Sequence, residues 1–216
     1  MTSTFAPWLV TSGLLVTALL IAEYRAHVGG KAVTKVLAAA CFVGTAWVHA
    51  SLSSTFALAI FVGLCLSLLG DVALIPTGSK RWFLLGLVAF LLAHVAYMIG
   101  FIALGIQASW LLASLLVLLP AGWWVRRWLI DDVPPKLRIA VQAYIVVISG
   151  MVACGIGAYG SHPNMTLLPV AASLFFVSDL AVAKQRFKKP SFQNKVWGLP
   201  TYFAAQMLFA LLAAGA

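Results

Sequence analysis

Acidic residues are scarce in this chain: only 5 of its 216 residues are Asp or Glu, and charged residues of both signs make up 9%. In a typical water-soluble domain roughly a quarter of the residues are charged, so this composition excludes that class. Hydrophobic residues account for 63% of the chain. Such a sequence is typical of an all-α polytopic membrane protein, for which the bilayer is the solvent.

Cysteines are also scarce, and so are basic residues near the N-terminus. The three cysteines, Cys41, Cys65 and Cys154, fall within apolar stretches. This placement indicates packing roles and argues against a disulfide framework or a metal site. No Lys or Arg precedes the first apolar run, so we expect a retained first helix and not a cleaved signal peptide. The net charge is +9, but the basic residues do not alternate with aromatic side chains as they would in a surface that stacks on bases. This argues against nucleic acid as a partner.

Eight apolar stretches are long enough to cross the hydrocarbon core as helices, which takes about 20 residues each. Their connectors are short, and none resembles a linker or a soluble domain. We therefore expect a single transmembrane domain over residues 1–216, folded as an eight-helix bundle. The predicted spans are 6–22, 33–50, 55–75, 82–105, 108–125, 136–157, 164–183 and 196–214.

The basic residues follow a regular pattern along the chain. All 14 Lys and Arg residues fall in or beside the first, third, fifth and seventh connectors. Because basic residues are retained on the cytoplasmic side, these connectors are predicted to be cytoplasmic and both termini outside. We expect an integral protein of the bacterial inner (cell) membrane.

Two aspartates interrupt apolar spans in matching places. Asp71 lies in SLLGDVALIP (67–76) and Asp179 in LFFVSDLAVA (174–183), 108 positions later, which is half the chain length. The third and seventh spans run in the same direction, and each carries its aspartate about one turn from its cytoplasmic end. This pattern suggests a 4+4 parallel pseudo-repeat, in which the two aspartates face each other.

Two interpretations of the aspartates remain open. Each carboxylate could reach interfacial water or pair with a nearby basic residue, such as Lys80 or Lys184. Alternatively, the two act together. An apolar environment, a helix C-terminus and a second carboxylate all make it unfavourable for both aspartates to be ionised at once. One member would then stay protonated, which makes the pair an acid and a base.

Several other polar residues fall within the spans and need partners there. His94 lies mid-span with Tyr97 one turn away on the same face, while Tyr202 and Gln206 form an i, i+4 pair. Each could be a core residue or interhelical hydrogen-bonding group, or could orient a substrate. No second deep histidine supports a metal site, so we expect no metal. The candidate orienting residues are Lys35, His94, Tyr97, Tyr144, Tyr202 and Gln206.

Two charged residues near span ends have simpler interpretations. Lys35 lies one turn into the second span and is expected to extend its ammonium group to the interface, with a phosphate or an aspartate as alternative contacts. Glu23 is expected to be interfacial. Together the polar residues favour the cytoplasmic half of the bundle, where a pocket would suit a lipid with an anionic head and an apolar tail. A small proton-coupled transporter and a non-catalytic lipid-binding protein remain alternatives.

Four stretches resemble, in their order and spacing, the signature stretches of the YhhN-like family. This family includes the transmembrane lysoplasmalogenases. The four stretches are SLLGDVALI, FLLAHVAYMIGF, FFVSDLAVAKQRF and TYFAAQMLFA, and the resemblance spans residues 30–210. One departure is visible: the lysine of the second span is often followed by proline in the family, whereas Lys35 precedes Val36.

The resemblance implies hydrolysis of the vinyl ether bond of a lysoplasmalogen to a fatty aldehyde and glycerophosphoethanolamine or glycerophosphocholine. Asp71 and Asp179 would be the catalytic acid and base, by the logic of glycosidases that pass through an oxocarbenium-like state. Lys35 and the basic connectors would attract the phosphate. No cofactor is required. The expected partners are the lysophospholipid and the bilayer, with a homodimer as the candidate assembly.

Overall fold

Eight long helices make up the structure, a computed structural model that describes residues 2–76 and 78–215. All eight are long and apolar enough to cross a membrane, and no strand occurs among the described residues, which confirms the predicted fold class. The helices are α1 (Thr2–Tyr24), α2 (Val28–His49), α3 (Thr55–Ala73), α4 (Lys80–Leu104), α5 (Ala108–Leu129), α6 (Arg138–Ser161), α7 (Leu167–Ala183) and α8 (Phe192–Ala214). Two short turns accompany them: η1 (Pro135–Leu137) and the π-helical η2 (Lys184–Lys188).

Several helices extend four or five residues beyond their predicted ends, and three of these ends carry basic residues. α2 begins at Val28 rather than at 33, because the His27 side chain caps it by accepting a hydrogen bond from the Gly30 amide. α8 begins at Phe192 rather than at 196, with Ser191 as its N-cap. α5 continues to Leu129, since basic residues are favourable in the last turn of a helix. Helices thus extend into the basic ends that the prediction excluded.

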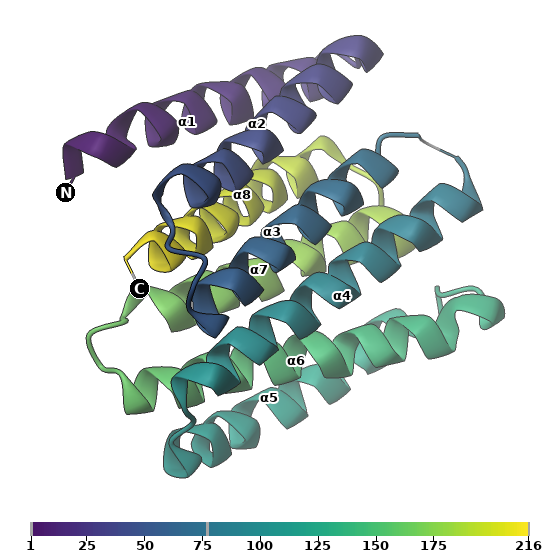
Figure 1. Ribbon diagram of the computed structural model, residues 1–216. Helices are drawn as coiled ribbons and strands as arrows, with labels where there is room; N and C mark the ends of the chain where they lie inside the picture. Colours follow the sequence, from purple (N-terminus) through teal and green to yellow (C-terminus); the bar gives the residue numbers. More distant parts are fainter. Residues whose placement is uncertain (1, 77, 216) are drawn as a thin grey trace.

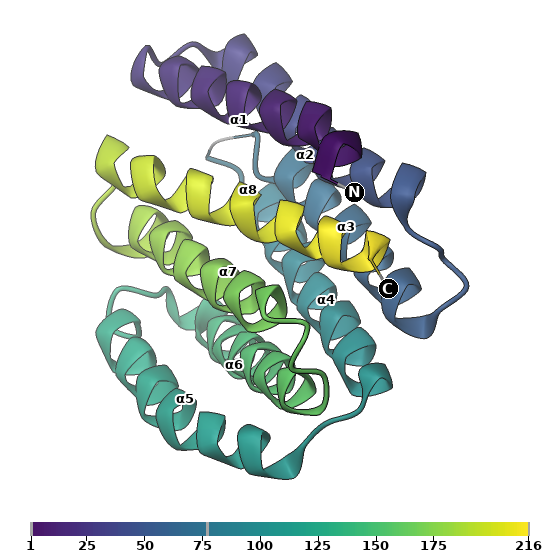
Figure 2. The same ribbon diagram turned by 90° about the vertical axis from the view of Figure 1, so that its left-hand side faces the viewer.

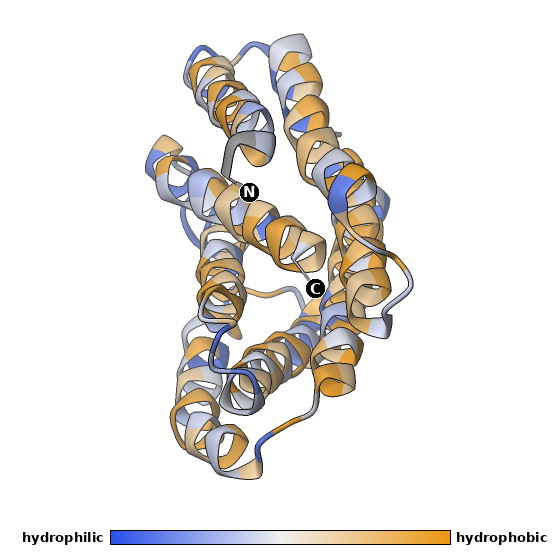
Figure 3. Ribbon diagram, turned by 60° about the vertical axis from the view of Figure 1, so that its left-hand side comes forward, coloured by the Kyte–Doolittle hydropathy of each residue, from blue (hydrophilic) through white to orange (hydrophobic). Residues whose placement is uncertain are grey.

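The connectors alternate between the two ends of the bundle. Figure 1 shows both termini at one end, together with the α2–α3, α4–α5 and α6–α7 connectors. The other four connectors, which carry or flank the basic residues, lie at the opposite end, here termed the connector end. Figure 3 shows the strongest hydrophilic colours mainly at helix ends and connectors.

The helix contacts repeat with a shift of four helices. α1 packs on α2 and α5 on α6; α3 packs on α4 and α7 on α8; α2 packs on α3 and α6 on α7. Contacts between the halves also come in pairs, since α8 packs on α2 and α4 on α6. The correspondence is incomplete, because α8 also packs on α3 and α1, whereas α4 has less extensive contact with α7 and α5. Figure 2 shows α8 lying between α1 and α7.

Aromatic side chains fill the interior where α3, α4, α7 and α8 meet. The largest fully buried ones include Tyr97, Phe175 and Phe209. Tyr97 fits only because Gly63 has no side chain, since a Cβ at Gly63 would lie 2.2 Å from Cε1 of the Tyr97 ring. Gly70 likewise admits Phe90, whose ring would lie 2.7 Å from an added Cβ. These close approaches bring α3 and α4 together beside Asp71.

Candidate active site

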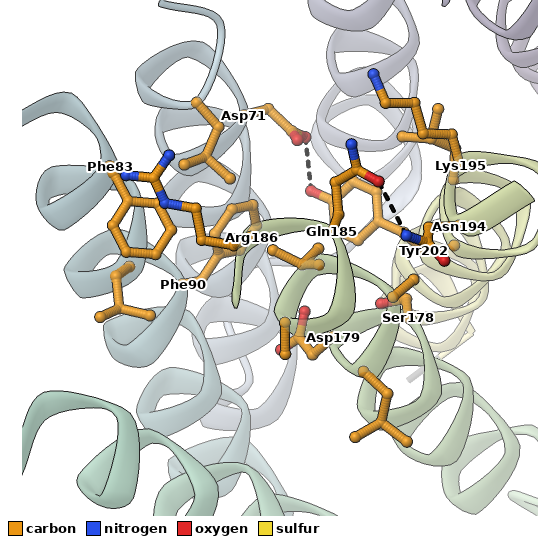
Figure 4. Close-up of a pocket in the computed structure, with 18 of the residues that line it drawn as sticks. Asp71, Phe83, Phe90, Ser178, Asp179, Gln185, Arg186, Asn194, Lys195 and Tyr202 are labelled. Atoms are coloured by element: carbon orange, nitrogen blue, oxygen red, sulfur yellow. Dashed lines mark hydrogen bonds between the residues drawn. The ribbon is translucent and has the colours of Figure 1, made fainter. Parts of the chain in front are cut away.

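A cavity of about 480 Å³ lies inside the bundle and reaches the connector end. Side chains from all eight helices line it, together with residues of the α3–α4 connector and η2. Both Asp71 and Asp179 are among the lining residues, and Figure 4 shows them on different walls of the same cavity. A cavity of this size, mostly apolar with a few polar groups, is typical of a small-molecule site.

Asp71 is almost fully enclosed and has donors on both carboxylate oxygens. Its residue exposure is 1%. The Lys35 ammonium of α2 lies 3.1 Å from Oδ1, and the Tyr202 hydroxyl of α8 donates to Oδ2 at 2.6 Å. The same ammonium donates to the Asp71 carbonyl oxygen at 3.4 Å, in the last turn of α3 where helical carbonyls lack partners. Lys35 therefore contacts an aspartate instead of extending to the interface.

Asp179 has a different set of partners. The Tyr144 hydroxyl of α6 donates to Oδ2 at 2.6 Å, and His94 Nε2 of α4 lies 3.3 Å from the same oxygen. The two partners also contact each other, since His94 Nε2 lies 3.0 Å from the Tyr144 hydroxyl. The Asp179 side chain is 16% exposed, and no described residue donates a hydrogen bond to its Oδ1.

The His94 ring has one nitrogen without a partner. It is fully buried, and Nδ1 makes no hydrogen bond to any described residue. A bare acceptor is tolerated there more easily than a buried N–H without a partner. The geometry therefore favours a neutral imidazole with its proton on Nε2, donated toward Asp179.

The two sets of partners are related by the pseudo-repeat. His94 and Tyr202 are 108 positions apart, as are the two aspartates, while Lys35 and Tyr144 are 109 apart. Each carboxylate thus has one partner from the preceding helix of its own half and one from the last helix of the other half. The sequence contained this spacing, but only the packing shows that the groups meet.

The model of the YhhN family matches residues 30–213, which is most of the chain. The chain belongs to the YhhN family. Its relatives include the proteins named lysoplasmalogenase TMEM86A of Bos taurus, 31% identical over 71% of this chain and 64% of its own length, and lysoplasmalogenase TMEM86B of Homo sapiens, 29% identical over 84% and 74%. The chain thus spans slightly under two thirds of the bovine protein. No solved structure matches it.

The stretches that are similar to the YhhN family lie at the cavity or directly behind it. Tyr97 and Gln206, both expected to orient a substrate, do not line the cavity. The Tyr97 hydroxyl donates to Gln206 Oε1 at 2.6 Å, and Gln206 Nε2 donates to Ser67 Oγ at 3.2 Å. All three are buried. This cluster joins α3, α4 and α8 behind the cavity wall, so in the structure it supports the wall that carries Asp71 and Tyr202.

The connector end of the cavity carries most of its charge. Glu23, expected at the interface, lines the cavity and pairs with Lys31 at 3.1 Å and Lys195 at 2.5 Å. The carboxylate thereby joins α1 to the first turns of α2 and α8. Among the described residues, no three His, Cys, Asp or Glu side chains gather as they would around a metal ion.

Sequence reasoning missed Arg186 as a cavity residue. It lies in η2, seven positions after Asp179, and its guanidinium carbon is 4.3 Å from the centroid of the Phe83 ring. Figure 4 shows the two side chains together on the wall that faces Gln185 and Lys195. A signal was available in FFVSDLAVAKQRF, since two residues seven apart lie on the same face of a helix.

Proposed function

We propose that this protein is a membrane hydrolase that cleaves the vinyl ether bond of lysoplasmalogens. Support comes from family membership, from relatives that carry the name lysoplasmalogenase, and from the cavity. One observation carries the chemical part: two aspartates, Asp71 and Asp179, line one cavity inside a membrane-spanning bundle. Cleavage of an enol ether by water needs a proton donor and a group that assists water, and two carboxyl groups can supply both.

The reaction itself is acid–base chemistry. A proton adds to the alkene carbon that is not bonded to oxygen, and the ether oxygen lone pair forms an oxocarbenium ion. Water then adds to the carbon next to oxygen and gives up a proton, forming a hemiacetal. The hemiacetal breaks its bond to the glycerol oxygen, which leaves as an alcohol, and a fatty aldehyde remains. The proton donor becomes a carboxylate as the cation forms, and a second carboxylate nearby stabilises the positive charge of that cation.

The different partners of the two carboxyl groups suggest different roles. Among the described residues, none donates a hydrogen bond to Asp179 Oδ1, and the partners of Oδ2 are a hydroxyl and an imidazole, so Asp179 is the proposed proton donor. Asp71 accepts from Lys35 and Tyr202 on both oxygens, an arrangement that favours a carboxylate. Asp71 would stabilise the cation and accept the proton from water. Tyr144, Tyr202 and His94 would hold the two carboxyl groups in place.

The decisive measurement is aldehyde release from a lysoplasmalogen by the purified protein in detergent. We expect Asp71→Asn and Asp179→Asn each to lower the rate at least about 100-fold, the scale of a lost general acid or base. Asp131→Asn is the matched control, because Asp131 is exposed and does not line the cavity. Release that persists in both cavity variants would contradict the mechanism, and a folded wild type that releases no aldehyde would contradict the function.

We also propose that the connector end faces the cytoplasm of a bacterium, with both termini on the other side of the inner membrane. The support is the collection of all 14 basic residues in or beside the four connectors at this end. The cavity would then receive its substrate from the cytoplasmic leaflet. A phosphatase that is active only outside the cytoplasm should be active when fused to the C-terminus and inactive when fused within the α7–α8 connector.

A further inference from the structure

Four cationic side chains line the cavity, and three of them already have a carboxylate partner. Lys35 pairs with Asp71. Lys31 and Lys195 share Glu23. The fourth is Arg186, which has no carboxylate within 4.0 Å and no hydrogen-bond acceptor among the residues that the structure describes. It is therefore the cavity cation whose charge is available to a ligand.

The guanidinium group is held by its contact with an aromatic ring. It lies over Phe83, whose ring packs edge to face against Phe187 at 5.9 Å. A cation over an aromatic face keeps its N–H edge available for hydrogen bonding, and the planar guanidinium matches two oxygens of a phosphate. Arg186 also lies in a π-helical turn, a rare conformation that often occurs at functional sites.

The charge of the cavity is complementary to a phosphodiester. Its four cations outnumber its three carboxylates, Glu23, Asp71 and Asp179, so the lining carries a net positive charge. A phosphodiester has one negative charge and two free oxygens. A lysoplasmalogen carries this group on one end of its glycerol and the vinyl ether on the other end of the same glycerol.

The spacing between Arg186 and Asp179 fits such a ligand. The two residues are seven positions apart, which is roughly 10 Å along a helix. In a lysoplasmalogen, seven covalent bonds separate the phosphorus from the alkene carbon that takes the proton, about 8 Å in an extended chain. A phosphate at Arg186 would therefore place that carbon near Asp179.

We propose that Arg186 binds the phosphate of the lysophospholipid head group and so positions the vinyl ether at the two carboxyl groups. This inference rests on the proposed function and assigns its phosphate-binding residue. It differs from the expectation for Lys35, whose ammonium group the structure places on Asp71.

The test compares two substrates, a lysoplasmalogen and the corresponding 1-alkenylglycerol, which lacks phosphate. Arg186→Gln should raise KM for the lysoplasmalogen about 10- to 100-fold, the scale of lost charge-assisted hydrogen bonds, with little change in kcat. KM for 1-alkenylglycerol should not change, and Arg186→Lys should restore part of the loss. Arg127→Gln is the matched control, because Arg127 also lies over an aromatic ring, that of Trp123 at 5.2 Å, but does not line the cavity.

The same KM as wild type for Arg186→Gln, or equal losses on both substrates, would overturn the proposal while leaving the function intact. If the wild type releases no aldehyde, the function fails, and thermal stabilisation by glycerophosphoethanolamine tests the site alone. Stabilisation of wild type but not of Arg186→Gln would support the phosphate site. Equal stabilisation of both proteins, no stabilisation, or stabilisation by inorganic phosphate only would overturn it.

Discussion

Asp71 and Asp179 occupy corresponding places in the two halves of the bundle, yet their surroundings differ in charge. Asp71 receives an ammonium group from α2 and a hydroxyl from α8. Asp179 receives a hydroxyl from α6 and a neutral imidazole from α4. Their side chains also differ in exposure, 2% for Asp71 and 16% for Asp179.

The comparison shows how one architecture can give two carboxyl groups different partners. Backbone position and helix direction are shared, so these features do not distinguish the two aspartates. The distinction comes from Lys35 in one half and Tyr144 in the other, 109 positions apart. An ammonium group favours the charged form of a neighbouring carboxyl group more strongly than a neutral hydroxyl donor does. The asymmetry of the partners therefore produces the proposed acid and base.

Removing the Lys35 ammonium group should have the largest effect on the difference between the two aspartates. Lys35→Met would leave Asp71 buried without an ion-pair partner, which costs about 3 to 5 kcal/mol when a buried pair is broken. We expect a lower thermal midpoint in detergent and loss of aldehyde release. Lys31→Met is the control, because Glu23 retains Lys195. A Lys35→Met protein as stable and active as wild type would show that the two aspartates are not distinguished by this lysine.

Removing one hydroxyl from each half should have an intermediate effect. Tyr144→Phe and Tyr202→Phe each delete a hydrogen bond of 2.6 Å to a carboxyl group. We expect each to lower kcat/KM roughly 10- to 100-fold, as expected for a hydrogen bond to a charged group. Tyr202→Phe should be the milder change, because Lys35 still contacts Asp71.

Steady-state rates of the two variants, measured beside Tyr159→Phe, check this order. Tyr159 packs on Trp110 and does not line the cavity, so its hydroxyl should be dispensable. A larger loss in Tyr202→Phe than in Tyr144→Phe would contradict this order. It would mean that Lys35 does not make Asp71 the better supported of the two aspartates.

The smallest effect on activity is expected behind the cavity wall. Tyr97→Phe removes the donor to Gln206 Oε1 and leaves a buried acceptor without a partner, at about 1 to 3 kcal/mol of unfolding free energy. KM should stay within a few-fold of wild type, since Tyr97 does not line the cavity. Thermal unfolding and substrate titration separate the two quantities. A large rise in KM with unchanged stability would place Tyr97 in contact with substrate.

The fold could be predicted because the bilayer imposes a length on each span. Eight apolar runs predict the number of helices, which the structure confirms, and the alternating distribution of Lys and Arg predicts their direction. The ends were less predictable, since Val28 and Phe192 begin helices that run through basic residues. Those starts depend on caps at His27 and Ser191, which hydropathy does not report.

The aspartates of the candidate site could be predicted from the sequence, whereas the roles of its tyrosine, glutamine and arginine residues could not. Asp71 and Asp179 stand out because a carboxyl group in an apolar span needs a reason. Tyr97 and Gln206 were grouped with the substrate-orienting residues, because periodicity shows which face of a helix they share but not whether that face meets a cavity or another helix. Arg186 was missed since its charge was already explained by membrane topology.

The exchange of partners between the halves has a consequence for assembly. Tyr202 belongs to the second half but holds Asp71, and His94 belongs to the first half but contacts Asp179. Neither group of four helices contains a complete environment for its own carboxyl group. Two fragments divided at the α4–α5 connector would each be incomplete alone and would recover both environments only as a pair. An ancestor built from one such half would have needed two copies to form the same cavity.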